Sequence, residues 1–190
     1  VSRGLGDVYK RQIIKYKYIF GGVCLRILGI DPGYAIVGFG IADYSGMNFA
    51  PLEYGAILTE AHTDFPRRLK SIADDIDYIL EKFSPDCMSI EKLFFTNNQK
   101  TAIDVAQARG VVVLSAVRHG VPVFEYTPLQ VKQAVVGYGK AEKKQVMDMT
   151  RRILKLEQIP KPDDAADALA LAICCLLYTS DAADDRISVD

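Results

Sequence analysis

The sequence lacks the usual marks of a secreted, membrane-spanning or thiolate-metal protein. Its four cysteines, Cys24, Cys87, Cys174 and Cys175, show no paired metal-ligand spacing and are typical of reduced cysteines in a cytosolic protein. No apolar run approaches the ~20 residues of a membrane span. The stretch YKYIFGGVCL is too short and too poorly flanked for a signal peptide. The sequence therefore predicts a cytoplasmic protein without a membrane partner.

An excess of charge of one sign is also missing. The 190 residues include 23 lysines and arginines and 24 aspartates and glutamates, so the formal net charge is −1. Any surface that binds nucleic acid must therefore be local. The two histidines, His62 and His119, are most simply surface or turn residues, and we assign neither a catalytic role. The length fits one domain with a sizeable core, and the composition is ordinary for a soluble globular protein.

The two ends differ in character from the middle of the chain. The stretches SRGLGDVYKRQ near the start and CLLYTSDAAD near the end resemble, each in one frame, the translation of sequencing-library adapters. We therefore interpret residues 1–12 and 175–190 as adapter-derived and exclude them from fold reasoning. This leaves an adapter-derived or upstream segment over 1–24, one domain over 25–174 and an adapter-derived tail. The second DAAD, at 181–184, is then accidental; a natural acidic tail is the alternative.

The order of the expected elements indicates an α/β domain. Continuous apolar runs ending at turn residues predict strands at 25–31, 35–44, 52–60, 86–91 and 121–126. Helical periodicity and helix-start signals predict helices at 64–83, 99–119, 127–136 and 141–156, and one from Asp163 onward. Three consecutive strands followed by alternating helices and strands predict one five-stranded mixed sheet. It would combine an antiparallel meander with parallel strands, flanked by helices.

Four acids stand at positions that suit chemistry. Asp31 and Glu91 each end an expected strand after an apolar run, and reactive groups of open α/β sheets gather at such strand ends. Asp164 and Asp167 are three residues apart, so both lie on one face of the last helix. Four converging carboxylates would repel one another unless divalent cations were present, and oxygen ligands suit Mg²⁺ or Mn²⁺. The matching reaction is two-metal phosphodiester hydrolysis.

Each acid also has a purely structural interpretation. Asp31 precedes Pro-Gly and suits a turn, and Glu91 could end its strand in solvent. Asp163 or Asp164 could cap the last helix, with Asp167 favoured there by the helix dipole. The combination favours function, because both strand-end acids follow strongly apolar runs and the helix acids lie in an alanine-rich segment.

Basic residues and aromatics suggest a local surface for nucleic acid. A basic cluster in an otherwise neutral protein suits phosphate binding, although runs of charge are often a solvated helix face. Exposed aromatics after Glu91 suit stacking on unpaired bases. The aromatics at this place are Phe94 and Phe95, of which Phe95 could instead belong to the core. The basic residues are Lys132, Lys140, Lys143, Lys144, Arg151, Arg152 and Lys155.

Five segments together resemble the RuvC Holliday-junction resolvases of clostridia-like bacteria. They are RILGIDPGYAIVGFGI, SIEKLFF, VAQARGVVVLSAV, VPVFEYTPLQVKQAVVGYGKAEKKQV and KPDDAADALALAI, within Leu25 to Cys174. The resemblance implies an RNase H-like fold and a homodimer that nicks four-way DNA junctions symmetrically in recombination and repair. It also implies Mg²⁺ as cofactor, with two ions in the site and Mn²⁺ as a substitute. The branch-migration helicase complex of RuvA and RuvB would be a partner.

The same resemblance assigns roles to individual residues. The catalytic and metal-binding acids of the family fall on Asp31, Glu91, Asp164 and Asp167, and none is substituted. Phe94 matches the stacking residue, and Lys132 and Lys143 match basic residues near the site. The last helix departs from the family pattern, because on the adapter interpretation it is cut shortly after the acids.

Three other functions are less consistent with the sequence. A ribosomal-RNA-processing nuclease of the same fold would carry strand-end acids, but AQARG and VKQAVVGYG argue against it. GIDPG resembles the first phosphate loop of actin-like sugar kinases, which need a second such loop and about twice this length. A non-catalytic junction-binding module is disfavoured by four intact acids.

The symmetry of the substrate predicts two copies of the chain. A four-way junction has two equivalent strands to cut, and two-fold related copies would offer two matched sites. The expected helix at 99–119 is apolar on more than one side, and its small residues would let two copies approach closely. A helix buried within its own domain is the alternative. The residues expected at the dimer contact are Ala102, Val105, Ala106, Ala108, Val111 and Val112.

Overall fold

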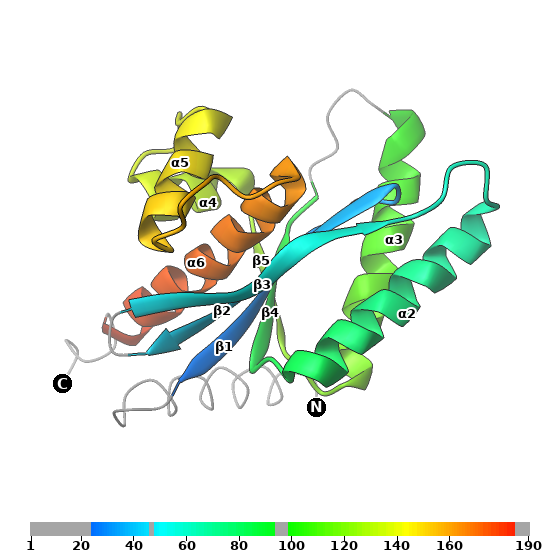
Figure 1. Cartoon of the computed structure of the whole chain (residues 1–190), viewed down its shortest axis with the longest axis horizontal. Helices are drawn as coiled ribbons and strands as arrows, with labels where there is room; N and C mark the ends of the chain where they lie inside the picture. The colour runs from blue at the N-terminus through cyan, green and yellow to red at the C-terminus, as the bar shows by residue number, and fades with distance from the viewer. Residues whose placement is uncertain (1–23, 46–47, 94–98, 185–190) are drawn as a thin grey trace, which may run out of the picture.

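The computed structural model describes residues 24–45, 48–93 and 99–184, which form one sheet with helices on both faces (Figure 1). The strands are β1 (Leu25–Asp31), β2 (Ile36–Ser45), β3 (Asn48–Leu58), β4 (Cys87–Glu91) and β5 (Val123–Tyr126). The helices are α2 (Phe65–Phe83), α3 (Gln99–Arg118), α4 (Pro128–Val136), α5 (Lys143–Ile153) and α6 (Asp163–Asp184). The type and order of the elements confirm the predicted α/β domain.

The sheet is mixed, as predicted, with strand order β3-β2-β1-β4-β5. Strands β1, β2 and β3 form an antiparallel meander, and β4 and β5 run parallel to β1. The register pairs Ile30 with Ile90, so β1 and β4 end side by side at one edge of the sheet. Parallel strands thus place the acids that follow these two isoleucines, Asp31 and Glu91, at a common edge.

Two hydrophobic layers hold the helices against the sheet. One layer joins Leu28, Ile30 and Met88 of the strands to α2 and α3, and the other joins Ile27 and Cys87 to α4, α5 and α6. Both layers contain fully buried strand residues, which explains why β1 and β4 have continuous apolar sequences instead of alternating ones. Figure 1 shows α2 and α3 on one side of the sheet and α4, α5 and α6 on the other.

Local signals fix several helix ends. Thr127 caps α4 as predicted: its side chain accepts a hydrogen bond from the backbone of Gln130, and the Gln130 side chain accepts one from the backbone of Thr127. Before α5, the Gln145 side chain accepts a hydrogen bond from the backbone of Glu142 at 2.8 Å. These two caps orient short helices that present lysines next to the sheet edge.

Helix α6 crosses the predicted boundary at 174–175 without a break. Cys175 and Leu176 are each 1% exposed and belong to the same hydrophobic layer as α4 and α5. The Tyr126 ring lies 5.7 Å from the Tyr178 ring, so the helix also packs against β5 beyond residue 175. Among the helices described, none is both long and apolar enough to cross a lipid bilayer.

Candidate active site

Side-chain alternation along β1 and β4 directs two acids to the same face of the sheet. Ile27 and Cys87 pack against α6, whereas the Ile30 and Ile90 side chains point to the opposite layer. Because successive strand residues point to opposite faces, the residues after these isoleucines again face α6. Asp31 and Glu91 therefore lie on the face covered by the helix that begins with the remaining two acids.

Glycines let α6 lie directly on the strands. Gly38 is the register partner of Asp31, and a Cβ atom there would overlap the backbone carbonyl of Asp164. A Cβ at Gly29 would overlap the carbonyl of Ala168 in the same way. Since the helix backbone touches the strands, its first turn brings Asp164 next to the end of β1. The sequence motif GIDPGYAIVGFGI thus places both an acid and the glycine that admits its helix neighbour.

The carboxylates share one electrostatic environment. Burial, the largest cause, and the nearby charges of Glu91, Asp167 and Asp164, in that order, together raise the pKa of Asp31 to about 7. Burial also raises the pKa of Glu91, and Asp167 adds to the rise. Asp31 is thus within electrostatic reach of Glu91, Asp167 and Asp164, and a cation would relieve the repulsion between these carboxylates.

A lysine stands among these acids. The Lys143 Nζ atom lies 2.9 Å from Asp167 Oδ2 and 3.7 Å from Asp163 Oδ2. The hydrogen bond to Asp167 raises the pKa of Lys143, and the same positive charge lowers the pKa of Asp31 and Glu91. Lys143 thus partly neutralises the acid cluster from the first turn of α5.

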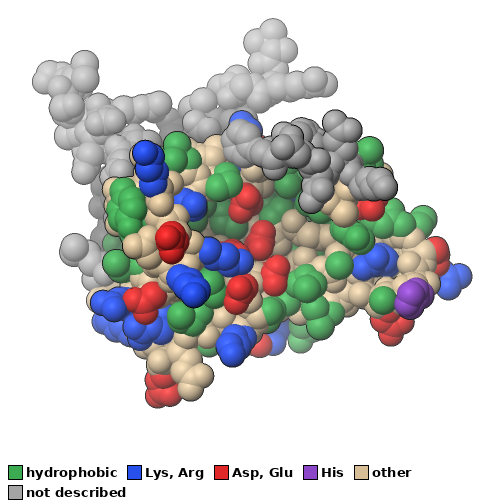
Figure 2. Space-filling view, turned by 90° about the horizontal axis from the view of Figure 1, so that it is seen from above, with side chains coloured by type: hydrophobic (Ala, Val, Ile, Leu, Met, Phe, Trp, Pro, Cys, Tyr) green, Lys and Arg blue, Asp and Glu red, His purple; other side chains and the backbone are tan. Residues whose placement is uncertain are grey.

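Two of the acids, Glu91 and Asp167, line a pocket of about 170 Å³. Its polar lining comprises Glu91, Lys132, Lys143 and Asp167, and its apolar lining comprises Pro128, Val131, Val146 and Leu171. Figure 2 views the molecule from above and shows acidic side chains in a hollow with lysine and arginine side chains beside them. Opposite charges side by side suit a ligand that carries phosphate and also binds a cation.

The donor set fits a hard divalent cation, because all four acids offer carboxylate oxygens. Within the described part of the chain, no three histidine, cysteine, aspartate or glutamate side chains converge closely enough to enclose a single ion. Of the four acids, Asp167 is the one that pairs directly with Lys143, at 2.9 Å.

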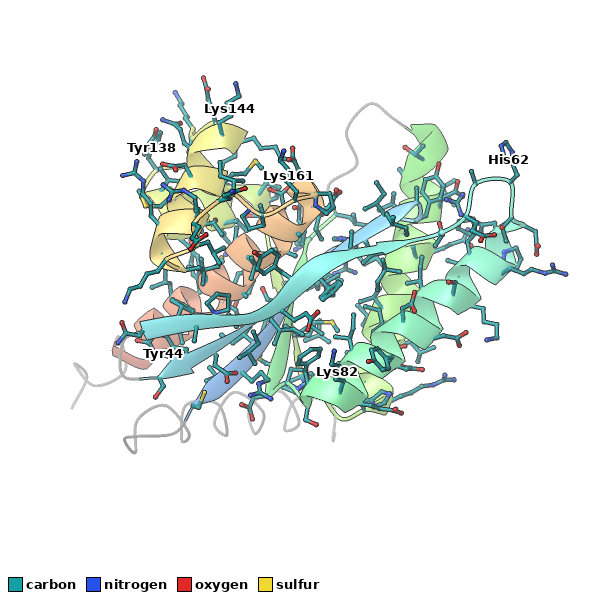
Figure 3. All side chains as sticks on the ribbon, viewed as in Figure 1. Tyr44, His62, Lys82, Tyr138, Lys144 and Lys161 are labelled. Atoms are coloured by element: carbon teal, nitrogen blue, oxygen red, sulfur yellow. The ribbon has the colours of Figure 1, made fainter. Side chains whose placement is uncertain are left out.

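The other basic residues predicted for DNA lie around α4 and α5. Lys140 and Lys144 are exposed, and Lys144 points away from the sheet at the outer end of α5 (Figure 3). Arg151 is engaged locally, because its guanidinium donates to Asp148 and to the carbonyl of Leu156. Arg152 also donates to Asp148. Phe94 and Phe95 lie outside the described residues.

Two of the α3 residues predicted to lie at a contact between two copies of the chain lie elsewhere. Ala108 and Val112 are fully buried and pack with α2 and the sheet inside their own domain. The exposed apolar residues of α3 are Ile103, Leu114 and Val117, which lie on its other face. Sequence periodicity did not distinguish the two faces, since both are apolar.

Two further features escaped the sequence reasoning. The packing role of Gly38 is invisible without the helix that covers it. Arg109 of α3 donates from Nε to the backbone carbonyl of Glu91 at 3.1 Å and forms an ion pair with Glu125. The AQARG motif pointed to Arg109 only as part of the family resemblance.

Comparison with known proteins gives consistent matches. The family model described as "Crossover junction endodeoxyribonuclease RuvC" matches residues 27–175. A protein of that name from Brevibacillus brevis is 58% identical over 149 residues, covering 78% of this chain and 90% of its own. The solved Thermus thermophilus RuvC structure is 34% identical with a TM-score of 0.78, covering 83% of this chain and 97% of its own. The same protein in complex with a Holliday junction substrate is 33% identical with a TM-score of 0.79, covering 83% and 96%.

Proposed function

This chain belongs to the RuvC family of crossover junction endodeoxyribonucleases, with its RNase H-like fold, and from this we propose that it resolves four-way DNA junctions. The reaction is the symmetrical nicking of two strands during recombination and repair. The observation that supports this most directly is the electrostatic effect of Glu91, Asp167 and Asp164 on Asp31, next to a pocket lined by Glu91, Asp167 and Lys143. A chromosomal substrate places the enzyme in the cytoplasm.

We infer that Asp31, Glu91, Asp164 and Asp167 hold Mg²⁺, with two ions in the site and Mn²⁺ as a substitute. Bound ions of this kind activate water and stabilise the leaving oxygen of a phosphodiester. The raised pKa of Asp31 means that a proton competes for this carboxylate near neutral pH. Lys143 keeps Asp167 oriented and offers its ammonium group to a phosphate oxygen at the same place.

The DNA-contacting surface extends from the pocket over α4 and α5. Lys132 and Lys143 line the pocket and would contact phosphates nearest the cut. Lys140 and Lys144 are exposed and would contact phosphates farther out. Arg151 would join them by exchanging Asp148 for a phosphate, and Phe94 would stack on an unpaired base at the junction centre.

The enzyme acts as a homodimer in this proposal. Ile103 is 62%, Leu114 is 50% and Val117 is 56% exposed along the outer face of α3. Gly110 lies between them, and no residue that the structure describes lies within 4 Å of a Cβ placed there, so a second helix has room to approach closely. A two-fold axis at this face would supply one site for each of the two strands. The RuvA and RuvB helicase complex would deliver the junction.

One gel experiment tests the activity. A synthetic four-way junction and a linear duplex of matched sequence are incubated with the protein in Mg²⁺, Mn²⁺ or Ca²⁺. We expect paired nicks in the junction with Mg²⁺ or Mn²⁺, and binding without cutting in Ca²⁺. Equal cutting of the linear duplex contradicts the structure specificity. Binding without cutting in all three metals identifies a junction-binding module, and preferential cutting of a ribosomal RNA hairpin identifies an RNA-processing nuclease.

A further inference from the structure

We propose that Arg109 is a positioning residue that holds the end of strand β4, and thereby the carboxylate of Glu91, in place for cleavage. The inference rests on the proposed assignment of Glu91 to the active site. Its basis is a pair of contacts made by one guanidinium. Nε donates to the Glu91 carbonyl oxygen at 3.1 Å, and a terminal nitrogen pairs with the carboxylate of Glu125.

Strand β4 ends at Glu91, where it has lost its pairing with β1 but keeps its pairing with β5. The last pair in the ladder between β1 and β4 is Ile30 with Ile90, so Glu91 lies one step beyond its β1 support. On the other side, β5 still pairs with it through Tyr126, and Lys92 donates its backbone N–H to the Tyr126 carbonyl. The Arg109 contact adds a charged donor at this strand end, and charge-assisted hydrogen bonds are stronger than neutral ones.

Arg109 reaches Glu91 from the face of the sheet opposite to the acids. Helix α3 packs in the layer of Ile30 and Ile90, whereas the Glu91 side chain points toward α6. The Arg109 side chain is only 17% exposed, which leaves little surface for DNA or for an ion. The pKa of Glu91 is shifted by burial, Asp167 and Lys143, which lie on the active face. Arg109 therefore acts on the main chain and not on the carboxylate charge.

Arginine suits this position better than lysine. Its planar fork can donate to the carbonyl and to the Glu125 carboxylate at once, while an ammonium group on a flexible stem reaches one of them well. Glu125 follows Phe124 on β5, beside the end of β4, so the guanidinium ties together α3, β4 and β5. If two copies meet through α3, this contact joins the dimer helix directly to the strand that ends in Glu91.

The test compares Arg109→Ala and Arg109→Lys with the wild-type protein. Single-turnover cleavage is measured at saturating protein, junction binding in metal-free buffer, and Mn²⁺ binding by calorimetry without DNA. Loss of a group that orients a ligand-bearing residue typically lowers metal affinity or activity by roughly 10–100-fold. We expect a loss in this range for Arg109→Ala in both cleavage rate and Mn²⁺ affinity, with junction affinity within about twofold. Arg109→Lys should recover part of each.

Two matched variants separate positioning from general stability. Arg118→Ala removes an exposed arginine from the end of the same helix and should leave all three measurements unchanged. Glu125→Gln removes the charge partner, which is 46% exposed, but keeps the arginine beside the Glu91 carbonyl, so its effect should be small. All rates are taken at a temperature where circular dichroism shows each variant folded.

Several outcomes overturn the assignment. One is an Arg109→Ala protein whose cleavage rate and Mn²⁺ affinity both stay within about twofold of wild type. Another is a loss of rate that follows junction binding, or a Glu125→Gln effect as large as that of Arg109→Ala. A wild-type protein that cuts no junction refutes the proposed function instead, because the comparison of Mn²⁺ binding needs no DNA and still tests Arg109.

Discussion

At the scale of single residues, the four acids are the sharpest assignment. Asp31→Asn, Glu91→Gln, Asp164→Asn and Asp167→Asn each remove a charged oxygen ligand while leaving the surface over α4 and α5 intact. We expect each to reduce junction cleavage by at least ~100-fold with little change in junction affinity. Denaturing gels measure cleavage, and native gels in Ca²⁺ measure binding. Near-wild-type cleavage by any two of the four would contradict the assignment.

The raised pKa of Asp31 also predicts that the stability of the protein depends on pH. Its pKa is about 7 in the fold and 3.8 in the reference state, so the folded protein binds the extra proton between these values. The stability from this group is complete below pH 3.8 and is lost as the pH rises through 7. Asp31→Asn should therefore match wild type near pH 4 and exceed it near pH 8, by at most roughly 4 kcal/mol at about 1.4 kcal/mol per pKa unit.

Scanning calorimetry in metal-free buffer measures this difference. Added Mg²⁺ should reverse it, because the cation stabilises only the protein that keeps the Asp31 carboxylate. If the difference between the two melting temperatures stays constant from pH 5 to 8, the pKa of Asp31 is not raised in the folded protein.

Sequence reasoning could propose the four acids because their positions follow from strand-end geometry and helical spacing. Lys143 was named as a basic residue near the site, but its ion pair with Asp167 depends on how α5 meets α6. Arg109 was not found, because a hydrogen bond to a backbone carbonyl requires only a donor at the right place. Any residue at position 91 would offer the same carbonyl oxygen, so the sequence gives no sign of this hydrogen bond.

At the scale of elements, most of the fold was predictable and the exceptions have local causes. Strand β3 begins at Asn48, earlier than the expected start at residue 52. Pro51 does not end the strand, because it lies next to a register shift on an edge strand, where proline is tolerated. Helix α3 was predicted as one element, but which apolar face turns inward depends on where α2 and the sheet lie. That choice put Val112 in the core and left Leu114 outside.

The contact between α6 and the sheet gives a prediction at this scale. Gly38→Ala places a methyl group against the backbone carbonyl of Asp164, so the start of α6 must shift away from β2. Overpacking of this kind costs about 1–3 kcal/mol in stability, and here it also moves Asp164, one of the proposed catalytic acids. We expect a lower melting temperature and a cleavage rate reduced by about tenfold or more.

Gly110→Ala in the monomeric Leu114→Glu background is the matched control for stability, since among the described residues none lies within 4 Å of a Cβ there. In a helix interior this change should stabilise the protein by about 0.5–1 kcal/mol. If both alanine variants melt alike, the close approach of α6 to β2 is not a constraint on the fold.

At the scale of the whole molecule, the end of α6 contributes to the core. Deleting residues 175–190 removes Cys175 and Leu176, both 1% exposed, together with the Tyr178 ring near Tyr126. We expect the melting temperature to fall by several degrees, since burying one large apolar side chain contributes about 1.5–3 kcal/mol. Deleting residues 1–12 should leave it unchanged. Thermal unfolding followed by circular dichroism compares the two deletions, and equal effects would contradict the expected difference between the ends.

The assembly is the last prediction, and the structure specifies which residues test it. Leu114→Glu and Val117→Glu place a charge on the outer face of α3, where burial against a second copy would leave it without water. We expect monomers that fold normally and nick one strand at a time. Val112→Glu, by contrast, places the charge in the core of the domain and should unfold it, so it cannot report on assembly.

Leu52→Glu provides the matched control, because Leu52 is 43% exposed on the edge strand β3, which lies at the far end of the sheet from β5. It adds the same charge and should leave the dimer intact. Sedimentation velocity at micromolar concentration measures assembly, and a supercoiled plasmid with an extruded cruciform separates single nicks from paired cuts. A wild-type monomer that still makes paired cuts would refute the dimer. A Leu114→Glu dimer would instead move the interface away from the outer face of α3.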